Sequence, residues 1–213
     1  MLRTSENMIK DATLKDPSDV EDIDKVREFL TGNAQAFEFL FDKYHEKVFG
    51  VAFRFVKHKE DALEITQEVF IRVYQGLSKF KTDSKFFTWL YRITVNRSID
   101  FLRSKKARPT VNFHRKEEQG QHGDITESIP NPKSTDPSKA LEEQEMADRL
   151  MEAVALLSSK HQSVFILHAV EQLSYKDIGE VLNCSIGTVM SRLYYARKKL
   201  QQYLTQTGYI EET

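Results

Sequence analysis

The stretch that decides the fold is SYKDIGEVLNCSIGTVMSRLYYARKKL, which runs from Ser174 to Leu200. Ser174 and Asp177 have the spacing of a capping box, in which a hydroxyl accepts a hydrogen bond from the backbone N–H three residues further on. Asn183 tolerates the left-handed conformation that ends a helix, and Ser185 suits the N-cap of the next helix. The stretch therefore predicts two helices joined by a tight turn, the geometry that lays a second helix in a DNA major groove.

The second of these helices has an apolar stripe that we expect to face inward. The stripe consists of Ile186, Val189, Leu193, Ala196 and Leu200. The remaining positions carry hydroxyls, aromatic rings and cations, which suit contacts to phosphates and base edges. By pattern alone, DNA binding and an ordinary helical pair, whose basic end complements the helix dipole, are equally good interpretations.

The overall composition limits what the chain can be. Charged residues make up 30% of the 213 residues and balance to a formal net charge of −1, so any basic surface is local. Gly and Pro are scarce, which favours long helices. The single cysteine, Cys184, excludes a disulfide framework within the chain and fits a reducing cytoplasm. The most apolar stretch is interrupted by Arg92 and is too short to span a bilayer, so we expect a cytoplasmic protein without membrane insertion.

Composition also divides the chain into four zones. Residues 1–24 are acidic and polar, and we expect them to be mobile. Residues 25–106 show dense helical periodicity, and this pattern returns over residues 140–205. Between them, residues 107–139 contain several prolines and few large apolar side chains, as linkers do. The prediction is an all-α fold of two helical domains joined by a flexible linker.

Three helices are predicted in the first domain, from apolar residues that recur at helical steps. They run from Ala36 to Phe55, from Asp61 to Leu77 and from Phe86 to Leu102. Phe37, Leu40 and Phe41 belong to the stripe of the first helix that we expect to face inward. Phe87 and Tyr91 fall off the stripe of the third helix, so they are candidates for contacts outside the core.

Four segments resemble the extracytoplasmic-function (ECF) sigma factors of the sigma-70 family. CSIGTVMSRLYYARKKL is similar to the CPxGTVxSRLxxARxxL pattern of the family's recognition helix, and LSSKHQSVFILHAVEQLSYKDIGEVL is similar to the segment before it. EDALEITQEVFIRVYQGLSKF and SKFFTWLYRITVNRSIDFLR resemble two segments of the family's conserved region two. The segments follow the family order and cover most of residues 33–204.

The resemblance implies a fold and a function. The fold is a sigma-two helical bundle and a sigma-four helix-turn-helix domain on a flexible linker. The function is to bind core RNA polymerase and direct it to promoter DNA, for a stress or envelope regulon. Sigma-two would bind the polymerase and the minus-ten element, and sigma-four the minus-35 element. An anti-sigma factor is a common partner in the family, and we expect the free protein to be a monomer.

A self-sufficient dimeric helix-turn-helix regulator is the alternative. Such a protein needs a dimerisation surface and a ligand or phosphoacceptor domain, and the sequence shows neither a long heptad seam nor the βα pattern of a phosphoacceptor domain. The sequence also has no phosphate-binding loop, nucleophile motif or metal-ligand spacing. We therefore expect no enzymatic activity, no cofactor and no bound metal.

The resemblance also implies roles for individual residues. The polymerase-docking surface is matched by Glu64, Gln67, Glu68 and Arg72. Contacts to minus-ten DNA are expected from Phe87, Tyr91, Arg92, Asn96, Arg97, Asp100 and Arg103. Contacts to minus-35 DNA are expected from Gly187, Thr188, Met190, Ser191, Arg192, Tyr194, Tyr195 and Lys198.

Two of these regions have a second interpretation. The loop from Ser78 to Lys85 matches the place where the family holds a flipped-out minus-ten base, so Phe80 either belongs to that site or anchors the loop to the core. Asp100 and Arg103 are three residues apart on one helix, so they also suit an ordinary surface ion pair.

Limited proteolysis tests the expected linker. The first cut in the free chain should fall within residues 107–139, because a segment of this composition buries too little apolar surface to fold. Mass spectrometry of the products should show two helical fragments. A first cut inside either helical zone, with residues 107–139 intact, would contradict the two-domain interpretation.

Overall fold

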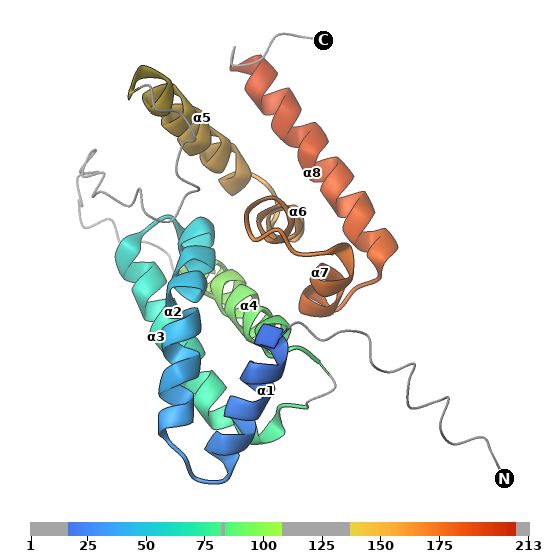
Figure 1. The fold of residues 1–213 in the computed structure, drawn as a ribbon. Coiled ribbons are helices and arrows are strands. Elements are labelled where there is room, and N and C mark those ends of the chain that lie inside the picture. Colours follow the sequence, from blue (N-terminus) through green and yellow to red (C-terminus); the bar gives the residue numbers. More distant parts are fainter. Residues whose placement is uncertain (1–16, 82–83, 108–136, 208–213) are drawn as a thin grey trace, which may run out of the picture.

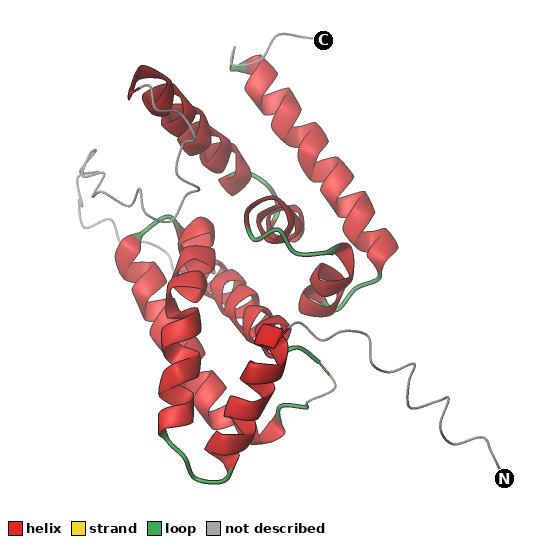
Figure 2. Cartoon of the chain, in the orientation of Figure 1, coloured by secondary structure: helices red, strands yellow, loops and turns green. Residues whose placement is uncertain are grey.

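The computed structural model describes residues 17–81, 84–107 and 137–207, and all regular structure in these residues is helical (Figures 1 and 2). The first domain contains α1 (Pro17–Leu30), α2 (Gln35–Val56), α3 (Lys59–Gly76), a short 3₁₀ helix η1 (Leu77–Lys79) and α4 (Phe86–Ala107). The second contains α5 (Pro137–Ala155), α6 (Ser159–Phe165), a π-helical segment η3 (Ile166–Val170), α7 (Tyr175–Leu182) and α8 (Ile186–Gln206). The all-α, two-domain prediction is confirmed. Most of the expected linker, residues 108–136, lies outside the described residues.

The first domain is a helical bundle whose core is formed mainly by α2, α3 and α4. Leu40, Ile65, Phe86 and Leu90 are fully buried there. They come from the three apolar stripes that the sequence predicts, so periodicity positions the core correctly. Phe41 is an exception, because 39% of its surface is exposed although we expected it to face inward.

The N-terminal boundary expected at residue 24 is corrected by α1, which begins at Pro17 and packs against α2. Proline at the first position of a helix costs no hydrogen bond, and its fixed φ suits the helix. Asp22 on α1 is completely buried and accepts hydrogen bonds from Tyr44 Oη and from Lys43 Nζ, the latter at 2.6 Å. The polar composition of this segment predicted a mobile tail, but the segment forms a helix in which Asp19 and Asp22 are buried. Residues 1–16 lie outside the described residues.

The tight turn between α7 and α8 forms as predicted. Ser174 Oγ accepts a hydrogen bond from the Asp177 N–H at 3.1 Å, and Ser185 Oγ accepts one from the Thr188 N–H at 3.2 Å. Asn183 ends α7 with a left-handed φ of 49°. The turn returns close to α7, since a Cβ at Gly179 would lie 2.8 Å from the Cys184 carbonyl oxygen. A glycine is therefore needed at this position.

The inward stripe of α8 is confirmed except at its first residue. Val189, Leu193, Ala196 and Leu200 are buried, whereas 48% of the Ile186 surface is exposed. Ile186 is the first residue of α8, so only one end of the helix surrounds it. The expectation that Ile186 faces inward is wrong.

The two domains contact each other between α4 and α7 and between α2 and α5 (Figure 1). Glu171, directly after η3, accepts hydrogen bonds from Arg54 Nη1 on α2 at 3.1 Å and from Tyr91 Oη on α4 at 2.9 Å. A further contact joins Lys85 Nζ to Asp177 Oδ1 at 3.7 Å. In this arrangement, a carboxylate of the second domain neutralises a guanidinium of the first.

Two substitutions at the start of α8 should have different effects on stability. Val189→Ala removes two fully buried methyl groups and should lower the free energy of unfolding by about 2 kcal/mol. Ile186→Ala changes an exposed side chain and should stay within about 0.5 kcal/mol of the wild type. Thermal unfolding followed by circular dichroism measures both. Equal destabilisation by the two variants would contradict the outward orientation of Ile186.

Candidate polymerase and DNA interfaces

The outward face of α3 carries the residues expected to dock on polymerase, but they have two kinds of environment. Glu64, Gln67 and Arg72 are exposed to solvent. Glu68 instead pairs with Arg97 of α4 through two hydrogen bonds, of which the Arg97 Nη2 to Glu68 Oε1 bond is 2.8 Å long. This hydrogen bonding lowers the pKa of Glu68 and raises the pKa of Arg97. Glu68 therefore holds α3 against α4, and Arg97 is occupied in the same pair.

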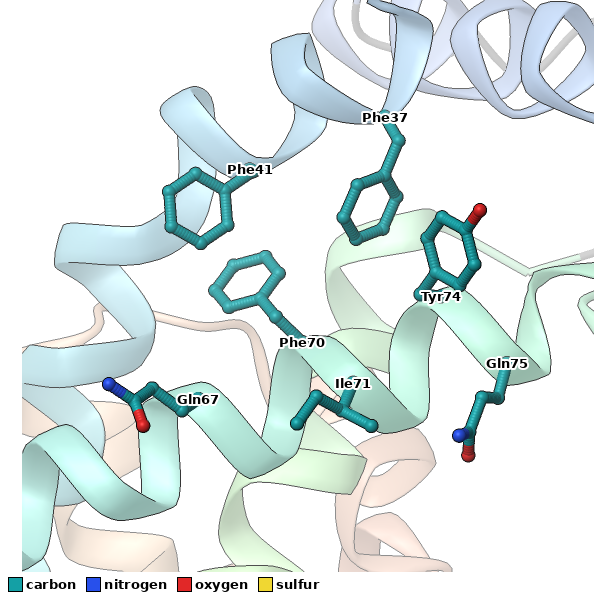
Figure 3. A pocket seen from close by; sticks show the side chains of 7 residues that line it. All are labelled: Phe37, Phe41, Gln67, Phe70, Ile71, Tyr74 and Gln75. Carbon is teal, nitrogen blue, oxygen red and sulfur yellow. The ribbon is translucent and has the colours of Figure 1, made fainter. Parts of the chain in front are cut away.

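An apolar groove adjoins Gln67 between α2 and α3 (Figure 3). It is lined by Phe37, Phe41, Gln67, Phe70, Ile71, Tyr74 and Gln75. The rings pack edge to face, with centroids 4.7 Å apart for Phe41 and Phe70 and 5.1 Å apart for Phe37 and Tyr74. Ile71 and Tyr74 are more than half exposed. An apolar surface of this kind, bordered by polar side chains, is typical of an interaction site.

Sequence reasoning missed this groove, although a signal for it was present. Gln67, Ile71 and Tyr74 are four and three residues apart, so they share one helix face. The charged residues of α3 predicted a polar docking face, and the apolar side chains of Ile71 and Tyr74 lie beside that face. Phe41 would have completed the pattern if its exposure had been foreseen.

The outer face of α4 presents a line of polar residues. Arg92, Asn96, Asp100 and Arg103 are exposed and follow each other at helical steps. Arg103 Nη1 lies 3.5 Å from Asp100 Oδ1, so the surface ion pair that was the second interpretation of these residues is present. Both side chains remain largely exposed, which keeps the pair weak and open to exchange with other partners.

The two aromatic candidates for minus-ten contacts are less accessible than expected. Tyr91 is only 4% exposed, its hydroxyl donates to Glu171, and burial raises its pKa far above the ordinary value. Phe87 is half-buried, with Lys85 Nζ 5.2 Å from the centre of its ring. Tyr91 is therefore unable to meet DNA while the two domains keep this arrangement.

Phe80 anchors its loop to the core. It is 8% exposed, and its ring centre lies 5.8 Å from that of Phe86 and 5.3 Å from that of Trp89. The first of the two interpretations, in which Phe80 belongs to a base-binding site, is disfavoured by this burial. Thr82 and Asp83 of the same loop lie outside the described residues.

The second helix of the helix-turn-helix, α8, is basic and carries no acidic residue. Gly187, Ser191, Tyr194, Tyr195 and Lys198 are exposed, as is Met190, which is 54% accessible. Thr188 and Arg192 are half-buried, and Arg192 Nη1 lies 3.7 Å from Cys184 Sγ. The residues expected to contact minus-35 DNA thus share one helix, and most of them face outward.

Some features that would suggest other classes of protein are absent from the described part of the chain. None of its helices has the length and hydropathy needed to cross a membrane. Its His, Cys, Asp and Glu side chains form no group of three that could hold a metal ion.

A helical bundle joined to a domain that ends in a helix-turn-helix with a basic second helix defines a DNA-binding protein of transcription. The family model described as Sigma-70 region 2 matches residues 40–108, and the one described as Sigma-70, region 4 matches residues 147–200. The chain belongs to the ECF sigma factors of the sigma-70 family, and it directs RNA polymerase in transcription initiation. The alternative, a self-sufficient dimeric regulator, is not favoured.

Characterised relatives align along most of the chain. It is 31% identical to the RNA polymerase sigma-H factor of Pseudomonas aeruginosa over 86% of this chain and 94% of the relative. It is also 31% identical to the ECF RNA polymerase sigma factor SigW of Bacillus subtilis, over 84% of this chain and 95% of the relative.

Solved structures share the fold. CnrH in complex with the cytosolic domain of CnrY matches with a TM-score of 0.63 at 22% identity, over 87% of this chain and 98% of that one. The sigma factor RpoE of Bartonella quintana, in complex with the anti-sigma factor NepR, matches with a TM-score of 0.55 at 18% identity, over 81% of this chain and 98% of that one.

The pair between Glu68 and Arg97 should contribute to stability in a pH-dependent way. Glu68→Ala should lower the free energy of unfolding by about 1 kcal/mol at pH 7, because it leaves a half-buried guanidinium without its partner. The pKa of Glu68 is lowered on folding, so its contribution is complete above the ordinary value of 4.5 and is lost as the pH falls through the lowered value.

Thermal unfolding of Glu68→Ala and of the wild type between pH 7 and pH 3 measures this contribution. The difference between the two proteins should shrink in acid. Glu46→Ala, which removes an exposed carboxylate of α2, is the control and should leave stability unchanged at both ends of the range. A difference that is independent of pH would contradict the role of the ion pair.

Proposed function

We propose that this sigma factor docks on core RNA polymerase through the outward face of α3 together with the apolar groove beside it. The observation that carries the proposal is the position of the exposed Ile71 and Tyr74 next to the exposed Gln67. Apolar anchors in a groove supply most of the affinity of a protein interface, and polar side chains at the rim supply orientation. Gln67 lines the polar edge of the groove, and Glu64 precedes it by three residues on the same helix face. The groove suits an amphipathic helix of the polymerase.

Glu68 acts indirectly in this docking. Its carboxylate is bonded to Arg97, so its contribution is to hold α3 in place rather than to offer a free acceptor to the polymerase. Removing Glu68 together with Glu64 and Gln67 would mix a change of interface with a change of stability. The docking surface is therefore tested best through Glu64 and Gln67 alone.

We infer that the outer face of α4 contacts the minus-ten element. Asn96 has the donor and acceptor pair that recognises adenine, and Arg92 and Arg103 are placed to hold phosphates on either side of it. Arg97 is engaged by Glu68, so its part is to position α4. Tyr91 and Phe87 would add stacking contacts to an unpaired base once the second domain moves away from α4.

We also infer that α8 lies in the major groove of the minus-35 element. The absence of acidic residues on α8 and the exposed Arg197, Lys198 and Lys199 favour contact with a polyanion. The first turns of such a helix reach base edges, whereas cations further along the helix hold the phosphate backbone.

The proposed partners place the protein inside the cell. Promoter DNA and core polymerase are found in the cytoplasm, and the proposed role is one of binding rather than catalysis. The fold shared with an RpoE that is solved with the anti-sigma factor NepR supports the further proposal that an anti-sigma factor also binds this chain. We propose that the free protein is a monomer. It binds the polymerase when no anti-sigma factor is bound to it.

Core binding tests the docking surface. The double variant Glu64→Ala with Gln67→Ala should keep the wild-type unfolding temperature and lose about tenfold in affinity for core polymerase. Fluorescence anisotropy of labelled protein titrated with purified core measures the affinity. Glu46→Ala, an exposed acidic position on α2, is the matched control. Unchanged affinity in the double variant would exclude this face of α3 from the interface.

Run-off transcription with purified core polymerase and a genomic promoter library tests the function as a whole. The holoenzyme should start transcription at a set of promoters that core polymerase alone ignores. Arg192→Ala should reduce transcription from promoters that depend on a minus-35 element by about tenfold, with core binding and circular dichroism unchanged. If neither Arg192→Ala nor Tyr195→Ala affects these promoters, the assignment of α8 to the minus-35 element fails.

A further inference from the structure

The start of α8 combines engaged polar groups with exposed apolar ones. The Thr188 hydroxyl is hydrogen-bonded to Ser185 Oγ at 2.9 Å, and the Ser191 hydroxyl donates to the Thr188 carbonyl at 3.0 Å. Ile186 and Met190, in contrast, are 48% and 54% exposed. In the turns that reach furthest into a major groove, the available side chains are thus largely apolar.

These apolar side chains form one ridge. Ile186, Met190 and Tyr194 are each four residues apart, so they lie above one another along α8. Tyr194 is 62% exposed, and its ring packs edge to face on that of Tyr195, with centroids 5.4 Å apart. The cations Arg197, Lys198 and Lys199 follow within the next turn. Because α8 is basic and has no acidic residue, DNA is the ligand that fits this face. The apolar ridge would then contact the base edges in the groove.

The major groove offers one apolar group, the 5-methyl group of thymine. The methionine thioether is flexible and polarisable, so it can follow a methyl group that a more rigid side chain would miss. We propose that Met190, supported by Ile186, reads the 5-methyl group of a thymine in the minus-35 element. This inference rests on the proposed contact between α8 and that element.

Uracil in place of thymine tests the inference, because it removes the methyl group and leaves the base-pairing edge unchanged. A minus-35 element is first selected from random sequence with wild-type holoenzyme. Each thymine of the selected element is then replaced singly by deoxyuridine, and holoenzyme binding is measured by competition. At least one replacement should weaken binding by about fourfold, which corresponds to the burial of one methyl group.

Variants identify the side chain that is responsible. Holoenzyme with Met190→Ala should bind the thymine and uracil promoters equally, whereas Met146→Ala, which changes an exposed methionine of α5, should discriminate as the wild type does. The inference is overturned if the selected element has no thymine, if no replacement matters, or if Met190→Ala still discriminates. Binding that does not depend on the minus-35 sequence at all would instead overturn the proposed function of α8.

A second inference rests on the contact between the two domains. The side chains of Glu171 and Arg54 are only 12% and 14% exposed in their ion pair. Other charges follow the same pattern across the contact. Lys57, directly after α2, lies in the field of the carboxylates of Asp148 and Glu152 of α5. Lys85 lies between Asp19 of its own domain, at 3.5 Å, and Asp177 of α7, at 3.7 Å. The first domain therefore contributes cations to this interface and the second contributes anions.

This complementarity has a consequence for the minus-ten surface. The carboxylate of Glu171 that pairs with Arg54 also holds the hydroxyl of Tyr91. Lys57 lies at the same contact, where burial lowers its pKa to about 8. We propose that Glu171 closes a cis-inhibitory clasp, in which the second domain of the free chain covers Tyr91, the aromatic part of the minus-ten surface, until polymerase separates the domains. This inference also rests on the proposed role of α4.

Opening of the clasp is measured in the free, full-length chain by small-angle X-ray scattering, and masking is measured by binding of a single-stranded minus-ten oligonucleotide. Glu171→Gln should expand the chain and raise oligonucleotide affinity roughly fivefold or more. Arg54→Gln removes the other member of the pair and should have the same effect on compactness. Glu180→Gln, an exposed acidic position of α7, is the control and should change neither quantity.

Two results would overturn the clasp. The first is that the Glu171→Gln chain stays as compact as the wild type. The second is that this chain opens but gains no affinity for the oligonucleotide, although wild-type holoenzyme melts promoters. If the holoenzyme itself makes no use of the α4 surface, as shown by unchanged initiation with Asn96→Ala, the proposed minus-ten role fails rather than the clasp alone.

Discussion

One carboxylate links the two domains through both of the helices that it meets. Glu171 is almost buried, and it accepts hydrogen bonds from the guanidinium of Arg54 and the phenol of Tyr91. A buried charge is tolerated only with a partner, so each domain supplies what the other needs. The two proposed DNA-binding surfaces differ in exposure. The outward side of α8 is exposed in this arrangement, whereas Tyr91 on α4 is buried and bonded to Glu171.

Local features of the fold could be predicted because local chemistry determines them. The turn between α7 and α8 needs a hydroxyl at Ser174, a left-handed residue at Asn183 and a second hydroxyl at Ser185, and all three positions are set by neighbours a few residues away. The buried stripes of α2, α3 and α4 follow from helical periodicity in the same way. The resemblance to ECF sigma factors then turned a fold prediction into a functional one that the family matches confirm.

The remaining features depend on contacts that no local pattern contains. Glu171 meets Arg54 across 117 residues of sequence, and Glu68 meets Arg97 across 29. Sequence reasoning therefore assigned Glu68 and Arg97 to different binding surfaces, although the two side chains are hydrogen-bonded to each other. Tyr91 illustrates the same limit. It lies off the apolar stripe of α4, which predicts exposure, but its hydroxyl is bonded to Glu171 of the second domain, and the pattern of α4 alone contains no sign of that contact. The α1 helix was missed because its buried acids resemble a solvated tail in composition.

The near-zero net charge of the chain hides an uneven distribution of cations and anions. Cations on the first domain, such as Arg54 and Lys57, face carboxylates of the second, so their charges cancel within the closed chain. No acidic side chain interrupts the cations of α8, which therefore dominate the local field that DNA meets. A polymerase that separates the domains would uncover Arg54 and Lys57 as well. The total charge is the same whether the domains are together or separated, so it carries no information about either proposed DNA-binding surface. The positions of the individual charges carry that information.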